Sequence, residues 1–325
     1  MRKVVLFAVN NGFASTVVGP LEVFAYTGGI WNYLTGTPLD LRFQVVVASI
    51  DGKPVTTHTG LVIQPDICIF DIEQADIILL TSCGEDIEAA LDQNRAITPW
   101  LNQQYTQGAT LGSICTGLAL LAATGLLARK RASTHWGMVE ILQKIYPLVK
   151  VEMDQIIIDH GQLITSGGGY AGNDLALHLV AKICGKQMAK QCANALLLET
   201  GRVSQVPFAG LQHHRMHQDE QIDKIQQWLD NHYQNNVNLD DLAKHHSMSP
   251  RNFKRRFKLA SGNTPLIYLQ KLRIEAAKNI LETTHLQIDQ VAYQVGYNNE
   301  SHFRQLFKRY TLLTPTNYRS RYSAL

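Results

Sequence analysis

Short apolar runs alternate with amphipathic segments along the first two thirds of the chain. The apolar runs have the length of buried strands, and the segments between them, such as 19–26 and 97–105, have helical spacing. The strand-like runs are KVVLFAV, FQVVVASI, ADIILLTS and GATLGSI. This alternation predicts an α/β domain with a parallel sheet covered by helices on both faces.

Three turn-like stretches follow predicted strands, at 81–86, 114–117 and 165–169. In the second of them, a strand stops at Cys115 and a helix begins just after it. Enzymes place nucleophiles on such a sharp strand-to-helix turn, a nucleophile elbow. Because the carboxyl ends of parallel strands meet at one edge of a sheet, we expect the three turns to border one site.

The pattern becomes helical throughout from about residue 221, and it repeats. Five residues recur 50 positions later with identical type: Phe253, Phe257, Thr264, Pro265 and Tyr268 become Phe303, Phe307, Thr314, Pro315 and Tyr318. A further pair, Leu242-Ala243, recurs as Val291-Ala292 at a spacing of 49. Two copies of one helical unit are therefore predicted.

Each copy has the pattern of a helix, a turn and a second helix. Ser249 can cap the second helix of the first copy, with Pro250 at its first position. The phenylalanines are four residues apart and face the core, which leaves polar and basic residues outside. A basic outer face on this helix suits entry into the DNA major groove. The candidate DNA-binding residues are Arg251, Asn252, Lys254, Arg255 and Lys258 in the first copy and Asn299, Ser301, His302, Arg304, Gln305 and Lys308 in the second.

Charge is divided unevenly along the 325 residues, whose formal net charge is +3. Residues 213–325 hold 16 Lys and Arg against 10 Asp and Glu, whereas residues 1–212 hold 14 against 17. An acidic partner therefore belongs to the C-terminal part, although a solvated basic face is the simpler alternative.

Length and composition indicate two globular domains, since 45% of the residues are hydrophobic and 18% are charged. We place the first domain at 1–209, a polar linker at 210–220 and the second domain at 221–325. The linker holds three histidines, at 213, 214 and 217, for which we favour solvation over metal binding. No apolar run is long enough to predict a membrane span, and the N-terminus reads as a strand, so we expect a cytoplasmic protein.

The five cysteines form neither a CxxC pair nor a Cys/His metal spacing. We therefore expect reduced thiols, no metal and no cofactor. Cys115 is the exception to a simple packing role, because a helix N-terminus can stabilise its thiolate. The other four are most simply small buried residues.

Four separated motifs of the first domain resemble the class I glutamine amidotransferase-like (PfpI-like) domain. They are GPLEVF, GSICTGLALLAATGLLARKRASTHW, LITSGGGYAGNDLALHLV and ETGRVSQVPFA, in that order. The resemblance implies a flavodoxin-like sheet and a pocket bounded by Gly84, Cys115 and the Thr134-His135-Trp136 segment.

Two departures from that resemblance weaken a hydrolytic mechanism. Thr116 occupies the position where related hydrolases have a histidine base, and Thr16 stands where they have an acid. Two roles remain for His135. It acts as a base from another part of the fold, or it is a structural histidine beside Trp136, and we favour the structural role. Glu22 either contacts Cys115 or braces its own helix. For Cys115 itself, we favour a role as pocket lining or as a redox-capable thiol over a role as a catalyst.

The second domain resembles the AraC/XylS family of transcription regulators over residues 221–321. The segments LAKHHSMSPRNFKRRFK, TPLIYLQKLRIEAAKNIL and VAYQVGYNNESHFRQLFKRYTLLTPTNYR carry the resemblance. It implies tandem recognition helices in successive major-groove segments on one face of DNA. Arg273, in the connecting helix, would support the scaffold or contact phosphate.

Together these features predict a DNA-binding transcription regulator, an activator controlled by a small metabolite in the first domain. The resemblance makes amino acids and quaternary amines plausible effectors, and a homodimer, promoter DNA and RNA polymerase are the expected partners. The alternative function is a cysteine-dependent amidase or hydratase fused to a DNA-binding domain. A third possibility is a redox sensor working through Cys115, for which the sequence shows no evident resolving cysteine unless Cys83 lies near it in space.

Overall fold

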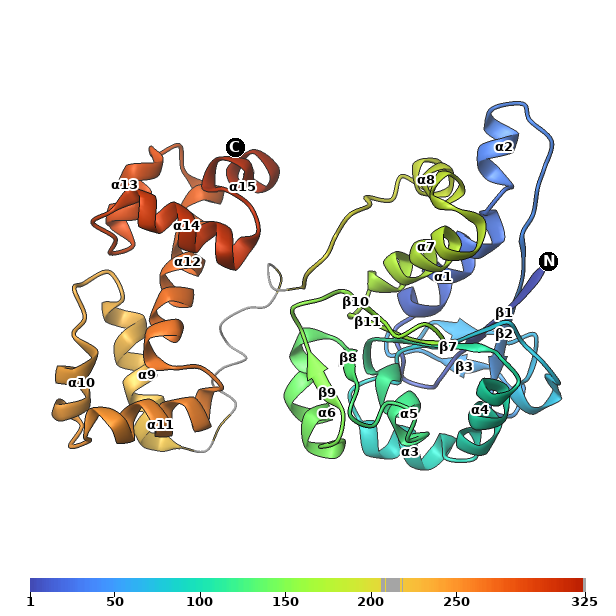
Figure 1. Cartoon of the computed structure of the whole chain (residues 1–325), viewed down its shortest axis with the longest axis horizontal. Coiled ribbons are helices and arrows are strands. Elements are labelled where there is room, and N and C mark those ends of the chain that lie inside the picture. The colour runs from blue at the N-terminus through green and yellow to red at the C-terminus, as the bar shows by residue number, and fades with distance from the viewer. Residues whose placement is uncertain (206–207, 209–216, 218, 324–325) are drawn as a thin grey trace. The chain divides into compact units, whose positions relative to one another are not determined.

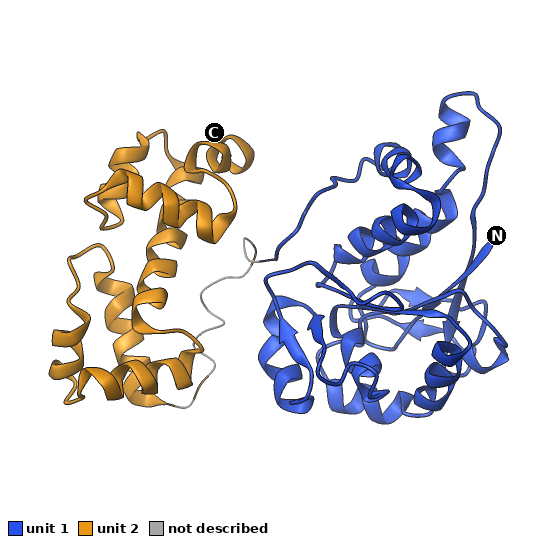
Figure 2. Ribbon diagram, viewed as in Figure 1, with its two compact units in different colours: residues 1–205 blue, residues 206–325 orange. Residues whose placement is uncertain are grey.

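A computed structural model describes residues 1–205, 208, 217 and 219–323. It divides into two compact units, residues 1–205 and 206–325 (Figure 2). Most of the linker predicted at 210–220 lies outside the described residues, as do His213 and His214. Within the described part, no helix has both the length and the apolar character needed to cross a membrane.

The first unit is built on a seven-stranded sheet in the order β10-β11-β7-β6-β1-β2-β5. Every neighbouring pair is parallel except β10 with β11. The strands are β1 Arg2–Phe7, β2 Phe43–Ser49, β5 Ile67–Cys68, β6 Ile77–Leu80, β7 Thr110–Ile114, β10 Ile157–Asp159 and β11 Leu163–Ser166. Two further pairs stand apart from this sheet: β3 Val55–Thr56 with β4 Val62–Ile63, and β8 Arg131–Ser133 with β9 Lys150–Glu152.

Helices cover both faces of the sheet, as the alternating pattern predicted (Figure 1). Successive β1 residues show the reason: Val4 and Leu6 belong to one apolar layer, while Val5 and Phe7 belong to the other. The first layer packs under α1 Ser15–Tyr26, α7 Ala171–Cys184 and α8 Lys186–Ala195. The second packs under α3 Ile87–Asn94, α4 Ile97–Thr106, α5 Leu118–Ala123 and α6 Val139–Ile145, and α2 Ile30–Leu34 follows α1. The predicted flavodoxin-like α/β architecture is confirmed.

The second unit is entirely helical within its described residues. Its helices are α9 Glu220–His232, α10 Leu239–His245, α11 Pro250–Ser261, α12 Pro265–Thr283, α13 Ile288–Gln294, α14 Glu300–Thr311 and α15 Pro315–Tyr322. They enclose two apolar cores, and α12 contributes to both, with Leu269 in the first and Ile274 in the second. This long helix therefore joins the two copies of the repeat.

The two copies share their ring packing, which confirms the predicted inward role of the phenylalanines. Ring centroids of Phe253 and Phe257 lie 5.6 Å apart, and Phe257 lies 5.4 Å from Tyr268. The corresponding distances from Phe307 are 5.6 Å to Phe303 and 5.4 Å to Tyr318. Since all four phenylalanines are fully buried, they hold the second helix of each copy in place and are unavailable to stack on bases.

Candidate functional site

Cys115 occupies a sharp turn between β7 and α5, as the sequence indicated. Its φ is +58°, a left-handed conformation that is rare outside glycine and costs free energy. The Cys115 N–H donates to the Gly167 carbonyl at 3.0 Å, which ties the turn to the loop after β11. Gly117 lets the turn approach β6, because a Cβ there would lie 2.2 Å from the Leu80 oxygen. The backbone of a nucleophile elbow is therefore present.

The environment of the Cys115 thiol opposes nucleophilic chemistry. Its side chain is almost fully buried, and this burial raises the pKa of Cys115 above the ordinary value of a thiol. Backbone N–H groups of Thr116 and Gly169 and the Ser82 hydroxyl act in the opposite direction, but they do not outweigh burial. The thiolate is the nucleophilic form of a cysteine, so a raised pKa disfavours the form that nucleophilic chemistry needs.

The two threonines at the departures from the enzyme pattern act as hydrogen-bonding groups that hold the loop after β6. Thr116 Oγ1 accepts from the Cys83 N–H at 3.0 Å and lies 3.0 Å from Ser82 Oγ. Thr16 Oγ1 accepts from the Ser82 N–H at 3.1 Å. Both threonines are buried, and neither hydroxyl can serve as a base near neutral pH. The same loop contains Gly84, whose φ of +78° and close approach to Asn11 suit glycine.

The remaining pocket candidates lie in different surroundings. Thr134 Oγ1 donates to the Cys115 carbonyl at 2.7 Å, so the segment before His135 touches the elbow. His135 Nδ1 accepts from the Gly137 N–H at 3.1 Å, and its ring lies 5.0 Å from that of Trp136, as expected for a structural histidine. Glu22, by contrast, is exposed on α1, and Thr16 is the α1 residue that reaches the elbow loops.

Sequence reasoning missed Gln205, which completes this group of loops. Its side chain accepts from the Gly168 N–H at 3.2 Å and donates to the Thr134 carbonyl at 2.7 Å. It is buried, and it is the last residue of the first unit. Its amide thus fastens the point where the chain leaves this unit to two loops that contact Cys115. Gln205 lies within the ETGRVSQVPFA motif, but the motif does not reveal this role, because the partners of Gln205 are far away in the chain.

The recognition-helix candidates of the first copy project from α11. Ser249 caps this helix by accepting from the Asn252 N–H at 3.3 Å, and Pro250 is its first residue, as predicted. Arg251, Lys254, Arg255 and Lys258 are exposed, while Asn252 is half-buried and accepts from Arg255 at 3.2 Å. Arg256, on the other side of α11, pairs with Asp219 at 2.7 Å and tethers the helix to the start of α9.

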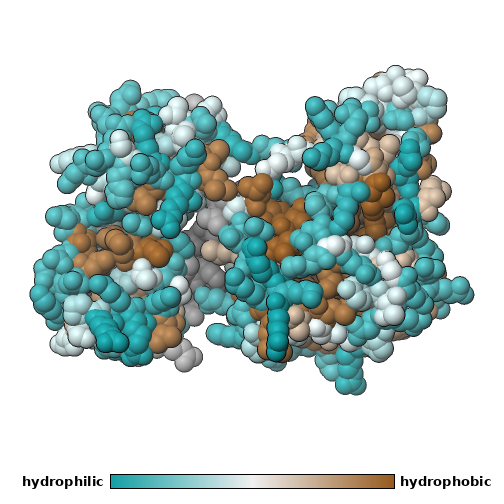
Figure 3. Space-filling model, viewed as in Figure 1, coloured by the Kyte–Doolittle hydropathy of each residue, from teal (hydrophilic) through white to brown (hydrophobic). Residues whose placement is uncertain are grey.

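The second copy presents a more polar and less basic face on α14. Ser301, His302, Arg304, Gln305 and Lys308 are all exposed. Asn299 caps the helix by accepting from the His302 N–H at 2.8 Å, so its carbonyl oxygen serves the fold. Arg304 is already paired with Glu300 at 2.6 Å. On the side shown in Figure 3 the surface of this unit is mainly hydrophilic, in keeping with these exposed residues.

Arg273 is placed by α12 as part of the scaffold. Its guanidinium donates to the carbonyls of Tyr233 and Asn235 at 2.7 and 2.8 Å and lies 5.1 Å from the Tyr297 ring centre. Burial lowers the pKa of Arg273, yet with an ordinary value of 12.5 the group remains charged at neutral pH. Of the two roles expected for this residue, its contacts favour support of the second core.

Family models match residues in both units of the chain. Residues 2–182 match the model of the DJ-1/PfpI family. The chain belongs to this family. Residues 242–321 match a helix-turn-helix domain, so this member carries the C-terminal helix-turn-helix predicted above.

Three relatives show what this family member is similar to. It is 28% identical to the HTH-type transcriptional regulator CdhR of Pseudomonas aeruginosa, over 84% of this chain and 81% of that protein. It is 31% identical to isonitrile hydratase of Pseudomonas putida over 45% of this chain and 62% of that protein. The crystal structure of Drosophila melanogaster DJ-1beta aligns with a TM-score of 0.52 at 18% identity, covering 61% of this chain and 99% of that chain, and supports the fold alone.

No group of three or more His, Cys, Asp or Glu side chains converges on a possible metal position within the described residues. The elbow loops also supply hydroxyl, amide and backbone groups, which can bind a polar molecule by hydrogen bonds.

Proposed function

We propose that the chain is a transcription regulator that binds promoter DNA through α11 and α14 and a small-molecule effector through its first unit. The observation that carries this proposal is the repeated helix-turn-helix, in which buried phenylalanines present two outward polar and basic helices. The name of CdhR supports the same role. Activation with RNA polymerase, a homodimeric state and action in the cytoplasm belong to the proposal.

An enzyme that also binds DNA is the second candidate, because the left-handed elbow at Cys115 is a feature of nucleophile-bearing folds. Two features disfavour turnover. The Cys115 thiol is buried, and threonines stand at the positions of the base and the acid in related hydrolases. The similarity to isonitrile hydratase covers less than half of this chain. We therefore favour the regulator.

Selection of bound sequences from a random duplex library, with the full chain as bait, tests this function. We expect enrichment of one motif with two half-sites and binding that weakens steeply with salt. Replacing Lys254 and Lys258 by alanine would lower the slope of log affinity against log salt by about 2, since each phosphate contact contributes about 0.9. Lys186→Ala, on α8, is the control and leaves the slope unchanged. Failure to enrich any sequence at low salt would overturn the proposal.

A further inference from the structure

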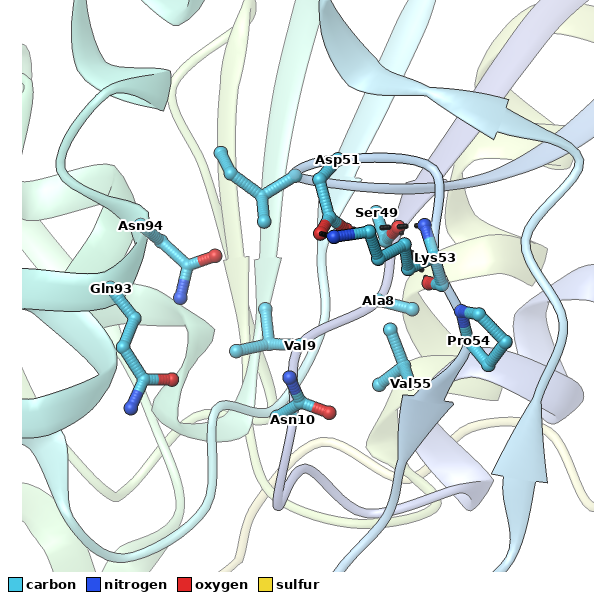
Figure 4. Close-up of a pocket in the computed structure, with 11 residues that line it drawn as sticks. Ala8, Val9, Asn10, Ser49, Asp51, Lys53, Pro54, Val55, Gln93 and Asn94 are labelled. Atoms are coloured by element: carbon cyan, nitrogen blue, oxygen red, sulfur yellow. Dashed lines mark hydrogen bonds and ion pairs between the residues drawn. The ribbon is translucent and has the colours of Figure 1, made fainter.

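A second site lies at the carboxyl edge of the sheet, at the ends of β1 and β2. It is a pocket of about 210 Å³, and Cys115 is not among the residues that line it (Figure 4). Its apolar lining comes from residues such as Val9 and Ile50, and its polar groups come from Asn10, Gln93, Asn94 and the loop 49–55. Open α/β sheets bind ligands at this edge, outside the carboxyl ends of their strands.

Asn94 and Ser49 are the buried polar residues of the pocket, with 4% and 3% of their surfaces exposed. The Nδ2 of Asn94 donates to the Ala90 carbonyl of its own helix at 2.8 Å. Its Oδ1 has no hydrogen-bond partner among the described residues and points into the pocket (Figure 4). This oxygen is open to the pocket rather than sealed from solvent, and it is available to accept a hydrogen bond from a bound N–H donor.

The opposite wall offers donors. Asn10 accepts from the Thr56 N–H at 3.0 Å through Oδ1, and its Nδ2 lies on the pocket side beside Val9 (Figure 4). At the rim, Lys53 Nζ lies 3.3 Å from Asp51 Oδ2. The loop that carries this pair is held by Ser49 Oγ, which donates to the Lys53 carbonyl at 2.9 Å. The rim thus presents one positive and one negative group at a defined place.

We propose that this pocket binds a small zwitterion of the amino-acid class. The ammonium of the ligand donates to Asn94 Oδ1, and its carboxylate accepts from Asn10 Nδ2 and Lys53. The lining has one acid and one base, so it matches a ligand of no net charge. Its described residues include no aromatic ring, and a quaternary amine lacks both N–H donors for Asn94 and the aromatic face that such cations prefer.

The inference that the bound zwitterion is the effector rests on the proposed function. The inference that the pocket binds a zwitterion does not. Isothermal titration of the full chain with each protein amino acid, and with glycine betaine as the quaternary amine, tests the binding. At least one amino acid should bind, and betaine should bind about tenfold more weakly or not at all, because a lost hydrogen bond to a charged group is worth about that factor.

Variants locate the bound molecule. Asn94→Leu keeps the size of the side chain and removes its polar atoms, and Lys53→Ala changes only an exposed rim residue in case the buried substitution disturbs folding. Each should weaken binding about tenfold, whereas the control Lys186→Ala leaves it unchanged. The proposal is overturned if no amino acid binds, if betaine binds as tightly, or if Lys53→Ala has no effect. Amino-acid binding without DNA binding would overturn only the proposed function, and DNA binding without amino-acid binding would overturn only this inference.

Discussion

The two compact units use polar side chains in opposite ways. Around Cys115, hydroxyls and amides face inward and bond to backbone groups of neighbouring loops, as Thr116 and Gln205 do. On α11 and α14, apolar rings face inward and the charged side chains project into solvent. Buried polar groups require partners within the fold, so the first arrangement specifies a structure. Exposed charges can exchange their partners for another molecule, as Arg304 with Glu300 and Lys254 with Asp240 would on DNA. The same residue types thus serve packing in one unit and face solvent in the other.

The comparison extends to the two recognition-helix candidates. The α11 helix carries no acidic residue, whereas Glu300 in the first turn of α14 pairs with Arg304. The ring-to-ring distances beneath the two helices match, but the helices also differ inside, since Leu306 packs in the second core where the corresponding Arg256 pairs with Asp219. Nonspecific attraction to phosphate should therefore come mainly from α11, and hydrogen-bonding groups for base edges mainly from α14.

The largest expected effect is on stability and would test the inward role of the rings. Phe257→Ala should lower the free energy of unfolding of the second unit by about 3–5 kcal/mol, because it opens a cavity in a core. Leu259→Ala, on the same helix but 73% exposed, should change it by less than about 0.5 kcal/mol. Urea titration of the full chain, followed by helical circular dichroism, measures both. Equal losses in the two variants would break the comparison.

A smaller effect is expected at Gln205, where the inward polar arrangement is most extensive. Gln205→Ala removes the partners of the Gly168 N–H and the Thr134 carbonyl, and should destabilise the first unit by about 1–3 kcal/mol. Hydrogen exchange at the Gly168 amide should accelerate. Gln187→Ala, at an exposed position of α8, is the matched control, and the same loss there would show that Gln205 has no special role.

The smallest effect concerns pH and the buried thiol. The pKa of Cys115 is raised by burial, so its contribution to stability is fully present below the pKa of an unfolded cysteine, about 8.5, and is lost as the pH rises through the folded-state pKa. Wild-type protein should therefore lose stability above this pH more steeply than Cys115→Ala. The pKa of Cys83, raised to about 11 mainly by its burial and also by the charge of Cys115, adds a further decline at higher pH in the wild-type protein.

Alkylation by iodoacetamide gives an independent measure of the same thiol. The rate at Cys115 in the folded protein should remain low at neutral pH, with Cys115→Ala identifying its signal by mass spectrometry. A midpoint of the rate below about 8.5 would mean a stabilised thiolate and would revive the enzyme and redox alternatives.

Periodicity and local chemistry alone determined much of this protein. Alternating apolar runs predicted the sheet and its two helical layers, and the 50-residue recurrence predicted two equal helical units, because these signals depend on neighbours along the chain. The left-handed turn at Cys115 and the cap at Ser249 were likewise local. The outward position of most basic residues on α11 followed from the same helical spacing.

Tertiary structure decided what these elements do to one another. Burial set the direction of the Cys115 pKa, and the fold placed Thr16 rather than Glu22 against the elbow loops. The contact of Gln205 with Thr134 spans 71 positions in the sequence, and Asn10 meets the pocket of Asn94 only because β1 and α3 end at the same edge of the sheet. Desolvation and long-range hydrogen bonds depend on which segments the folded chain brings together, and no local pattern encodes that choice.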